Sequence, residues 1–164
     1  MPILNENALE VFSRSADQTR RFGMRLGRYL KVGDLICLNG ELGSGKTTFI
    51  QGIAQGWGSI DPATSPTFVL INEYQRMDRS LLFHMDAYRI GSNPEAEELD
   101  LDRMLQEGAL LIEWAERIDR VLPKERLGID LYWIADEQRR LFFTPEGERY
   151  RELTRAFRQN AFGV

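Results

Sequence analysis

One stretch of the sequence combines glycine, lysine and a hydroxyl residue at the spacing G-x-x-x-x-G-K-[ST]. Residues 40–47 read GELGSGKT and match that pattern at each fixed position. The glycines allow a tight turn whose N–H groups face phosphate oxygens, and a helix beginning at Lys46 adds the positive end of its dipole. The Lys46 ammonium can reach the outer phosphates, and the Thr47 hydroxyl can ligate Mg²⁺. The pattern predicts a nucleoside triphosphate site, with the Lys46 side chain exposed while the loop is empty.

Two apolar runs farther along the chain each stop at a carboxylate. LLFHMD ends at Asp86 and ALLIE ends at Glu113. Mg²⁺ bound beside phosphates usually takes one or two carboxylates and keeps several waters, so both acids are candidate ligands. His84, the one histidine, alternates with Phe83 and Met85 and should face the opposite side of its strand. It is either a hydrogen-bonded structural residue or a member of the site.

The absence of one motif favours ATP over GTP as the nucleotide. Guanine recognition in the GTPases comes with an Asn-Lys-x-Asp stretch, and the sequence contains none. We therefore expect ATP as the nucleotide, with Mg²⁺ as its metal.

The N-terminal elements must place the loop at the end of a strand. Ser15 and Gln18 fit a capping box that opens a helix, and a turn signal follows at Gly33. The order that we expect is a helix over 15–30, a turn over 31–34, a strand over 35–38, the glycine loop, and a helix over 46–55 closed by Gly56 and Gly58.

The remaining elements supply the acids and complete the sheet. Strands over 67–74 and 81–85 should form an antiparallel hairpin, because the segment 75–80 is too short for a crossover helix. The other elements that we expect are a buried strand over 109–114 after an acidic helix, a hairpin of 127–134 with 139–144, and a helix over 149–160. No repeat or linker divides the chain, so residues 1–164 should form a single α/β domain with a mixed parallel and antiparallel sheet flanked by helices.

The composition argues against nucleic-acid binding through charge, against a membrane protein and against a disulfide-linked protein. The formal net charge is −4, which argues against a protein that binds nucleic acid mainly through its own charge. No apolar run approaches the roughly 20 residues that a membrane-spanning helix needs, so we expect no membrane contact. Cys37 is the one cysteine, which excludes an internal disulfide and fits a reducing cytoplasm.

Several motifs together resemble one family. GELGSGKTTF, SPTF followed by Tyr74, FHMDAYRI and LIEW occur in the order found in TsaE, a family of bacterial P-loop ATPases. The resemblance implies a P-loop NTPase fold and a slow Mg²⁺-dependent ATPase that supports threonylcarbamoyladenosine synthesis beside the anticodon of tRNAs reading codons that begin with A. It also implies that the TsaB–TsaD heterodimer is the partner and the stimulator, that TsaD carries the transferase chemistry, and that tRNA is met only through that complex.

The resemblance assigns roles to single residues. Lys46 would be catalytic, Thr47 and Glu113 would be linked to Mg²⁺, and Asp86 would order the attacking water directly or through the metal's water shell. Asp86 stays open as an alternative metal ligand. The nine residues that would hold ATP are Gly40, Glu41, Leu42, Gly43, Ser44, Gly45, Lys46, Thr47 and Thr48.

Four further residues would act around the nucleotide. Ser65 and Thr67 resemble a switch that senses the γ-phosphate, and Ala16 and Arg139 would flank the adenine. The partner would dock on either the basic helix face from Arg20 to Arg28 or the acidic stretch from Glu95 to Asp102, and we favour the acidic stretch.

Two other functions use the same loop. A small-molecule kinase needs an acceptor pocket and usually an Arg-rich lid, and Arg139-Arg140 is the one tight basic pair after the loop. A free-standing regulatory module would bind nucleotide with negligible turnover. The hydrolysis rate with and without the TsaB–TsaD pair distinguishes these alternatives from a partner-dependent ATPase.

Overall fold

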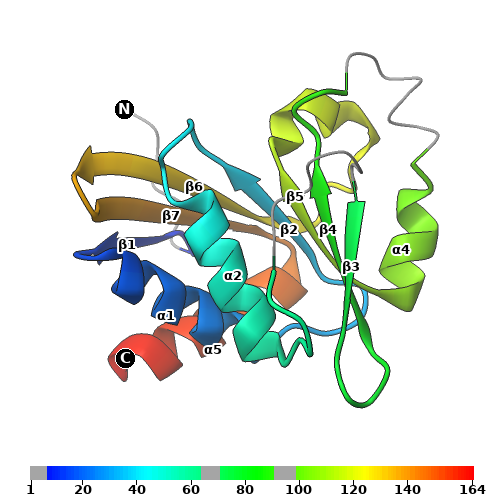
Figure 1. Cartoon of the computed structure of the whole chain (residues 1–164), viewed down its shortest axis with the longest axis horizontal. Coiled ribbons are helices and arrows are strands. Elements are labelled where there is room, and N and C mark those ends of the chain that lie inside the picture. The colour runs from blue at the N-terminus through cyan, green and yellow to red at the C-terminus, as the bar shows by residue number, and fades with distance from the viewer. Residues whose placement is uncertain (1–6, 64–70, 91–98) are drawn as a thin grey trace.

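The structure is a computed structural model that describes residues 7–63, 71–90 and 99–164. Within these residues, seven strands form one sheet in the order β1-β7-β6-β2-β5-β4-β3 (Figure 1). The strands are β1 (Leu9–Ser13), β2 (Leu35–Asn39), β3 (Ile71–Gln75), β4 (Leu81–Asp86), β5 (Gly108–Glu113), β6 (Arg126–Ala135) and β7 (Gln138–Glu146). The helices are α1 (Ala16–Gly27), α2 (Lys46–Trp57), α4 (Leu101–Glu107), α5 (Glu148–Phe162) and the 3₁₀ segment η1 (Ala115–Val121).

The centre of the sheet is parallel and its margins are antiparallel. Strand β2 pairs in parallel with β5 and β6, and β4 pairs in parallel with β5. Hairpins β3–β4 and β6–β7 add the antiparallel parts. The expected α/β fold with a mixed sheet is therefore confirmed. The edge strand β1, antiparallel to β7, was not predicted from the sequence.

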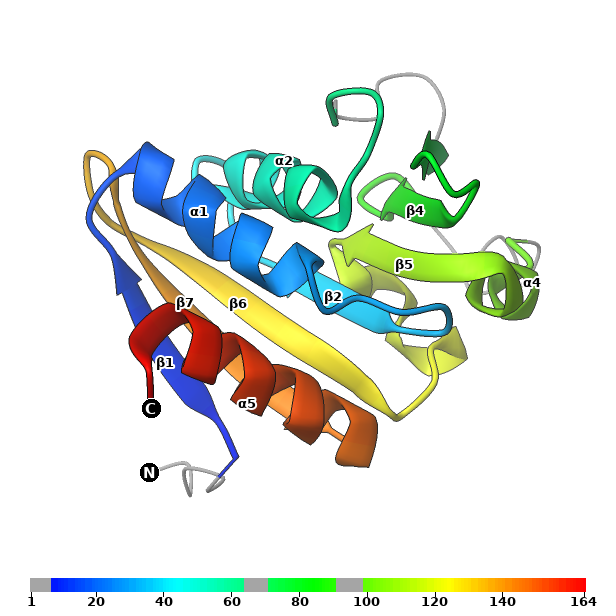
Figure 2. The ribbon, with the colours of Figure 1, turned by 90° about the horizontal axis from the view of Figure 1, so that it is seen from below.

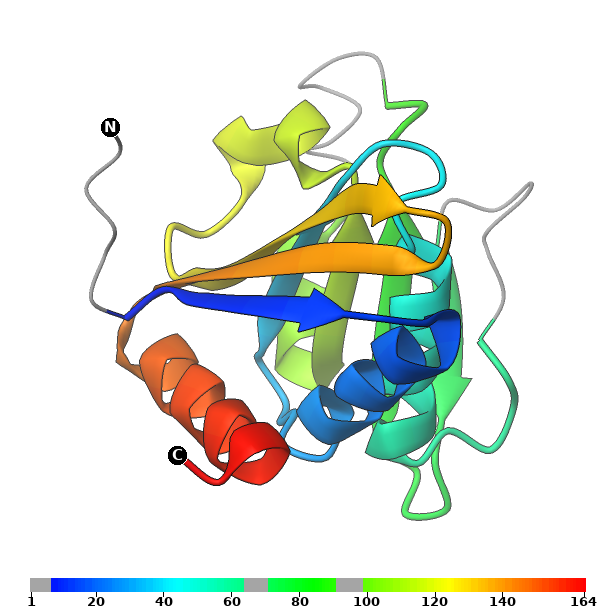
Figure 3. The ribbon, with the colours of Figure 1, turned by 90° about the vertical axis from the view of Figure 1, so that its left-hand side faces the viewer.

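Helices cover the sheet on both faces. Figures 1 and 2 show α1, α2 and α5 on one face, where their apolar side chains form one core cluster with alternate residues of the strands. Helix α4 and η1 cover the β4–β5 half of the other face and share a second cluster there. Figure 3 shows the long β6–β7 ribbon with β1 beside it. Parallel strands β2, β4 and β5 are buried on both sides, which explains why they read as continuous apolar runs.

Helix α1 begins as the sequence predicts. The Ser15 hydroxyl accepts a hydrogen bond from the Gln18 N–H at 3.0 Å, and the Gln18 side chain accepts one from the Arg14 N–H at 2.7 Å. The first bond pairs an N–H group that the helix itself leaves unpaired, and the second ties the residue before the N-cap to the first turn.

Helices α1 and α2 approach until their backbones touch. A Cβ atom added at Gly23 or Gly27 of α1 would overlap a carbonyl oxygen of α2, and one added at Gly52 or Gly56 of α2 would overlap a carbonyl oxygen of α1. Only glycine fits at such positions. The sequence had indicated that the helix ends before Gly56, and the structure corrects this: Gly56 lies within the helix. The helix continues to Trp57 and ends at Gly58, which is left-handed with φ 104°.

A buried ion pair fixes the start of α5. Arg149 donates to both carboxylate oxygens of Asp34, at 2.9 and 2.8 Å, and to the carbonyl of Tyr29 at 2.7 Å. Asp34 also accepts from the Lys31 N–H at 2.8 Å. The bidentate pair joins α5 to the turn between α1 and β2, and its hydrogen bonds compensate the buried carboxylate for lost water.

The glycine contact generates a stability prediction. Helix propensity alone predicts that Gly56→Ala stabilises α2 by up to about 1 kcal/mol. The overlap with the Met24 carbonyl should reverse the sign and cost about 1–3 kcal/mol, as overpacking does. Urea unfolding of wild type and variant measures the difference. Gly128→Ala is the control, because its Cβ would have 3.7 Å to its nearest neighbour. A Gly56→Ala variant at least as stable as wild type would contradict the packing.

Candidate functional site

The glycine loop lies where β2 ends and α2 begins. Gly43 and Gly45 have φ angles of 82° and 98°, in the left-handed region that glycine adopts without strain. Gly45 occupies the N-cap position of α2, and no side chain caps this end. The helix dipole of α2 favours negative charge at this end, where the loop lies. Sheets of this kind bind ligands at the carboxyl ends of the parallel strands, which is where this loop lies.

A hollow of about 380 Å³ opens in front of the loop. It brings residues from the loop, α2 and the ends of β4 and β5 together with the start of β7. Its lining consists of Glu41, Leu42, Gly43, Ser44, Gly45, Lys46, Thr47, Thr48, Asp86, Glu113, Trp114 and Arg139. The hollow therefore unites the predicted loop residues, except Gly40, with both predicted carboxylates.

Lys46 is buried rather than exposed, which corrects the expectation from sequence. Its side chain donates to the Gly40 carbonyl, lies 3.5 Å from the Glu41 carbonyl oxygen, and only 7% of the residue is exposed. The ammonium also lies 4.0 Å from the centre of the Trp114 ring, a cation–π contact. Burial lowers the pKa of this ammonium below its usual value, and four nearby acids, led by Glu113, partly offset that effect. The polar contacts of the Lys46 ammonium are thus with backbone carbonyl oxygens of the loop.

The two carboxylates are neighbours. Asp86 and Glu113 lie opposite each other in the parallel β4–β5 register. Glu113 is buried, whereas Asp86 is half-buried and accepts a hydrogen bond from the Tyr88 N–H at 2.9 Å. Both acids line the hollow that also contains Lys46, so a cation bound there would meet two oxygen-donor side chains on neighbouring strands.

His84 occupies the position that the alternation predicts. Phe83 and Met85 pack into the α4 side of the sheet, and His84 faces the α2 side. Its Nε2 lies 2.8 Å from Glu113 Oε2, and its Nδ1 lies 3.0 Å from the Tyr74 hydroxyl. The alternation indicated the face, but nothing in the sequence indicated these partners.

Trp114 lies at the rim of the hollow beside Glu113. It is half-buried and has φ 59°, which is rare for a bulky residue. The centre of its ring lies 5.0 Å from that of Tyr88, and the backbone N–H of Trp114 donates to the Leu38 carbonyl at 3.1 Å. The strained turn aims the indole at Lys46, and strained residues of this kind cluster at functional sites.

The residues present fit a Mg²⁺ ion that is shared with phosphate. The hydroxyl of Thr47 and the carboxylates of Glu113 and Asp86 are hard oxygen donors, which Mg²⁺ prefers. The described part of the chain contains no group of three or more His, Cys, Asp or Glu that could hold a metal alone. A Mg²⁺ that takes one or two carboxylates and completes its shell with phosphate and water matches this donor set.

The residues predicted around the adenine lie in different places. Arg139 lines the hollow and passes beside Gly45, from which an added Cβ would lie 3.5 Å from the arginine Cγ. Its Nη1 donates to three backbone carbonyls of the β6–β7 turn, at 2.7–3.1 Å. Ala16 begins α1 and is not part of the lining. Ser65 and Thr67 lie outside the described residues.

Sequence reasoning missed an apolar corner next to the loop. A second hollow of about 360 Å³ is lined by the loop and by Leu131, Tyr132 and Trp133 at the end of β6. Leu42 at its edge is 94% exposed, and Trp133 is also exposed. In the sequence, the apolar–polar alternation of residues 127–131 gives way to the unbroken apolar run LYWIA over 131–135, and this run is the signal that could have indicated exposed apolar residues here.

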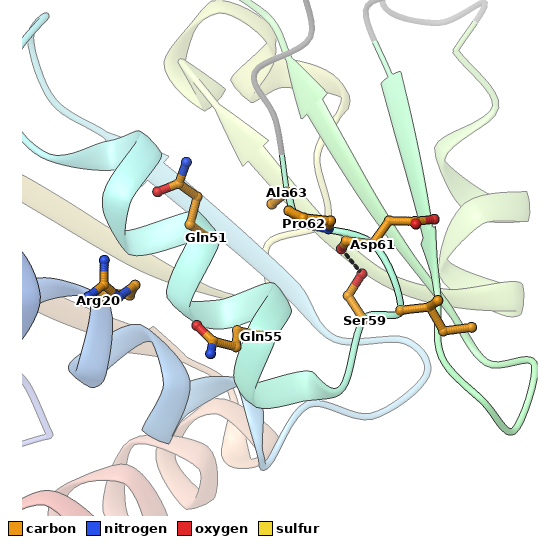
Figure 4. Close-up of a pocket in the computed structure, with 8 residues that line it drawn as sticks. Arg20, Gln51, Gln55, Ser59, Asp61, Pro62 and Ala63 are labelled. Atoms are coloured by element: carbon orange, nitrogen blue, oxygen red, sulfur yellow. Dashed lines mark hydrogen bonds between the residues drawn. The ribbon is translucent and has the colours of Figure 1, made fainter.

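A more voluminous hollow lies elsewhere and offers different chemistry. It measures about 560 Å³ and lies between α2 and the segment 59–63, with Arg20, Gln51 and Gln55 along one side (Figure 4). Arg20 is engaged by Asp17 within α1. The smaller hollow at the loop contains the lysine, the hydroxyl and both acids, so chemistry rather than volume identifies the site. No helix in the described ranges is long and apolar enough to cross a membrane.

Comparisons with known proteins identify the family of the chain. Residues 13–141 match the family model described as threonylcarbamoyl adenosine biosynthesis protein TsaE. The tRNA threonylcarbamoyladenosine biosynthesis protein TsaE of Bacillus subtilis is 41% identical over 139 residues, which are 84% of this chain and 85% of that protein. The TsaE protein of Streptomyces coelicolor is 40% identical over 137 residues, covering 80% and 93%.

A solved structure shares the fold. The crystal structure of Bacillus subtilis YdiB superposes with a TM-score of 0.78 at 34% sequence identity and covers 93% of this chain and 95% of that one. The family model spans more than half of the chain, and the sequence relatives align over most of their length. The chain belongs to the TsaE family and has its role in the biosynthesis of threonylcarbamoyladenosine in tRNA.

Proposed function

We propose that the chain binds ATP with Mg²⁺ in the hollow at the glycine loop and hydrolyses it slowly, as an accessory ATPase of the TsaB–TsaD complex. The observation that carries the proposal is the convergence of Lys46, Thr47, Asp86 and Glu113 on one helix N-terminus. Phosphoryl transfer requires mainly positioning and neutralisation of charge, and these groups are of the types that supply both.

Each group has a distinct part in the proposed reaction. The loop N–H groups and the start of α2 bind the phosphates, and Lys46 exchanges its backbone carbonyl partners for phosphate oxygens. Glu113 and Thr47 hold the metal, which when bound neutralises the charge that develops on the phosphates. Asp86, nearer the solvent, orients the attacking water. Arg139 and the apolar corner at Trp133 lie on the β6 side of the loop, away from both acids, and are candidates for the base side of the nucleotide.

The partner would add positive charge that stabilises the transition state. Arginines inserted by a partner can accelerate related reactions by roughly 10³–10⁵. We infer that docking on TsaB–TsaD accelerates hydrolysis, that tRNA is contacted only through that complex, and that the cycle runs in the cytoplasm. The docking surface is the acidic stretch from Glu95 to Asp102, of which residues 99–102 lie within the described structure and Asp102 is exposed on α4.

The first experiment separates the two carboxylates. Glu113→Gln should weaken Mg²⁺-dependent ATP binding at least about tenfold, because it removes a charged metal ligand. Asp86→Asn should leave binding intact and slow single-turnover hydrolysis by about 10² or more, the usual worth of a positioned acid or base. Glu152→Gln, an exposed acid on α5, is the control. The reverse pattern in Mg²⁺ titration and single turnover would exchange the two roles.

The second experiment tests the partner. Steady-state phosphate release at saturating ATP should rise at least about tenfold when TsaB–TsaD is added. Asp102→Lys should reduce that stimulation without changing the rate of the isolated chain. Arg28→Glu, which reverses an exposed charge on the basic helix face, should leave the stimulation unchanged. A fast intrinsic rate that TsaB–TsaD leaves unchanged would defeat the accessory role. Transfer of phosphate to an added small molecule would establish a kinase instead.

A further inference from the structure

A hydrogen-bonded chain of three side chains crosses the sheet beneath α2. It runs from the Tyr74 hydroxyl on β3 to Nδ1 of His84 on β4, at 3.0 Å, and from Nε2 of His84 to Oε2 of Glu113 on β5, at 2.8 Å. All three residues are buried. They are diagonal neighbours on one face of adjacent strands, an arrangement that lets side chains of this size meet.

The chemistry of the partners fixes the direction of the chain. A carboxylate only accepts hydrogen bonds, so the N–H of this bond is on Nε2 of His84, which donates the hydrogen bond to Oε2 of Glu113. The tyrosine hydroxyl can then donate to the unprotonated Nδ1. This arrangement pairs both ring nitrogens, which suits a buried site where an unpaired polar group is costly.

The bond from His84 also limits the Glu113 side chain. Oε2 is engaged by the histidine, so Oε1 is the oxygen left for a ligand in the hollow that Glu113 lines. Metal sites gain affinity when an outer hydrogen bond fixes the orientation of a ligating group, and losing such a bond typically costs 10- to 100-fold in affinity or activity. Asp86 accepts a hydrogen bond from the backbone N–H of Tyr88 and is not one of the three hydrogen-bonded side chains.

We propose that His84, itself held by Tyr74, is a positioning residue that orients the Glu113 carboxylate toward the Mg²⁺ site. The proposal rests on the proposed function, since it assumes that Glu113 serves a metal-bound nucleotide. His84 touches neither the metal nor the nucleotide and acts through Glu113. Tyr74 fixes the proton of the imidazole on Nε2, which lets the ring donate to the acid.

The test uses a variant that removes one hydroxyl. Tyr74→Phe keeps the ring in the core and deletes the far end of the chain, whereas His84→Ala would leave Glu113 unpaired and endanger folding. Calorimetry should give ATP binding in EDTA within about twofold of wild type and a Mg²⁺ half-saturation raised by about 3- to 10-fold, less than the loss of the bond to Glu113 itself would cause, because that bond remains in the variant. Tyr150→Phe is the matched control. That buried hydroxyl accepts from the Leu35 N–H at 2.9 Å, far from the loop, so its loss should lower stability and leave the Mg²⁺ dependence unchanged.

A second readout does not depend on activity. His84 is the one histidine of the chain, so its ring nitrogens give unambiguous signals in ¹⁵N NMR of the full-length protein. The free wild type should carry its proton on Nε2, and this signal should shift when Mg²⁺ is added to the complex with a non-hydrolysable ATP analogue. Tyr74→Phe should weaken the preference for the Nε2 proton.

The outcomes separate this proposal from the function on which it rests. Wild-type protein without Mg²⁺-dependent ATP binding would overturn the proposed function and this role together. Normal wild-type binding with an unchanged Mg²⁺ half-saturation in Tyr74→Phe, an equal change in Tyr150→Phe, or a proton on Nδ1 would overturn the role of His84 alone.

Discussion

The close contact between α1 and α2 is the constraint on which the site depends. Four glycines remove the side chains that would otherwise hold the two helices apart, so α2 lies against α1 and over the sheet in one position. That position brings the N-terminus of α2 to the end of β2, beside the acids that end β4 and β5. A shift of α2 by even one ångström would misplace the loop against these acids, and misplacement on that scale costs catalysis heavily.

The protein's own groups surround the charge of Lys46. Lys46 is buried, and burial disfavours its charged form, as the direction of its pKa shift shows. Two adjacent acids and the loop carbonyls stabilise the ammonium, and the Trp114 ring covers it. A magnesium-bound polyphosphate would give the lysine anionic partners and give the acids a cation. The groups around Lys46 are therefore of the types that a metal-bound triphosphate would pair with.

The motif and the acids were predictable because each depends on neighbours in sequence. GELGSGKT requires only a strand before it and a helix after it, and the ends of the strands at Asp86 and Glu113 follow from apolar runs that stop. The hairpins were equally local, since short connections leave antiparallel pairing as the one outcome. Family resemblance, rather than spacing, supplied the separate roles of the two acids.

What the sequence could not provide depends on contacts between distant segments. β1 is a strand because β7 offers it an edge, and Gly56 remains helical because a carbonyl of α1 faces it. The burial of Lys46 follows from Trp114, sixty-eight residues away, and the His84 chain joins three strands whose pairing no local pattern specifies. In each case tertiary packing overrides or completes a local preference.

The central claim is that ATP binds in the glycine loop at Lys46. The most direct test is to measure the ATP affinity of the Lys46→Met variant by calorimetry. Methionine keeps an unbranched apolar side chain beneath Trp114 and removes the charge, so the fold should survive where a smaller residue would leave a gap. Hydrogen bonds to charged groups contribute about 1.5–3 kcal/mol, so the variant should lose about 10- to 100-fold in affinity, and Lys124→Met, at an exposed lysine, should lose none. Equal affinity in wild type and Lys46→Met would show that the nucleotide does not bind in this loop.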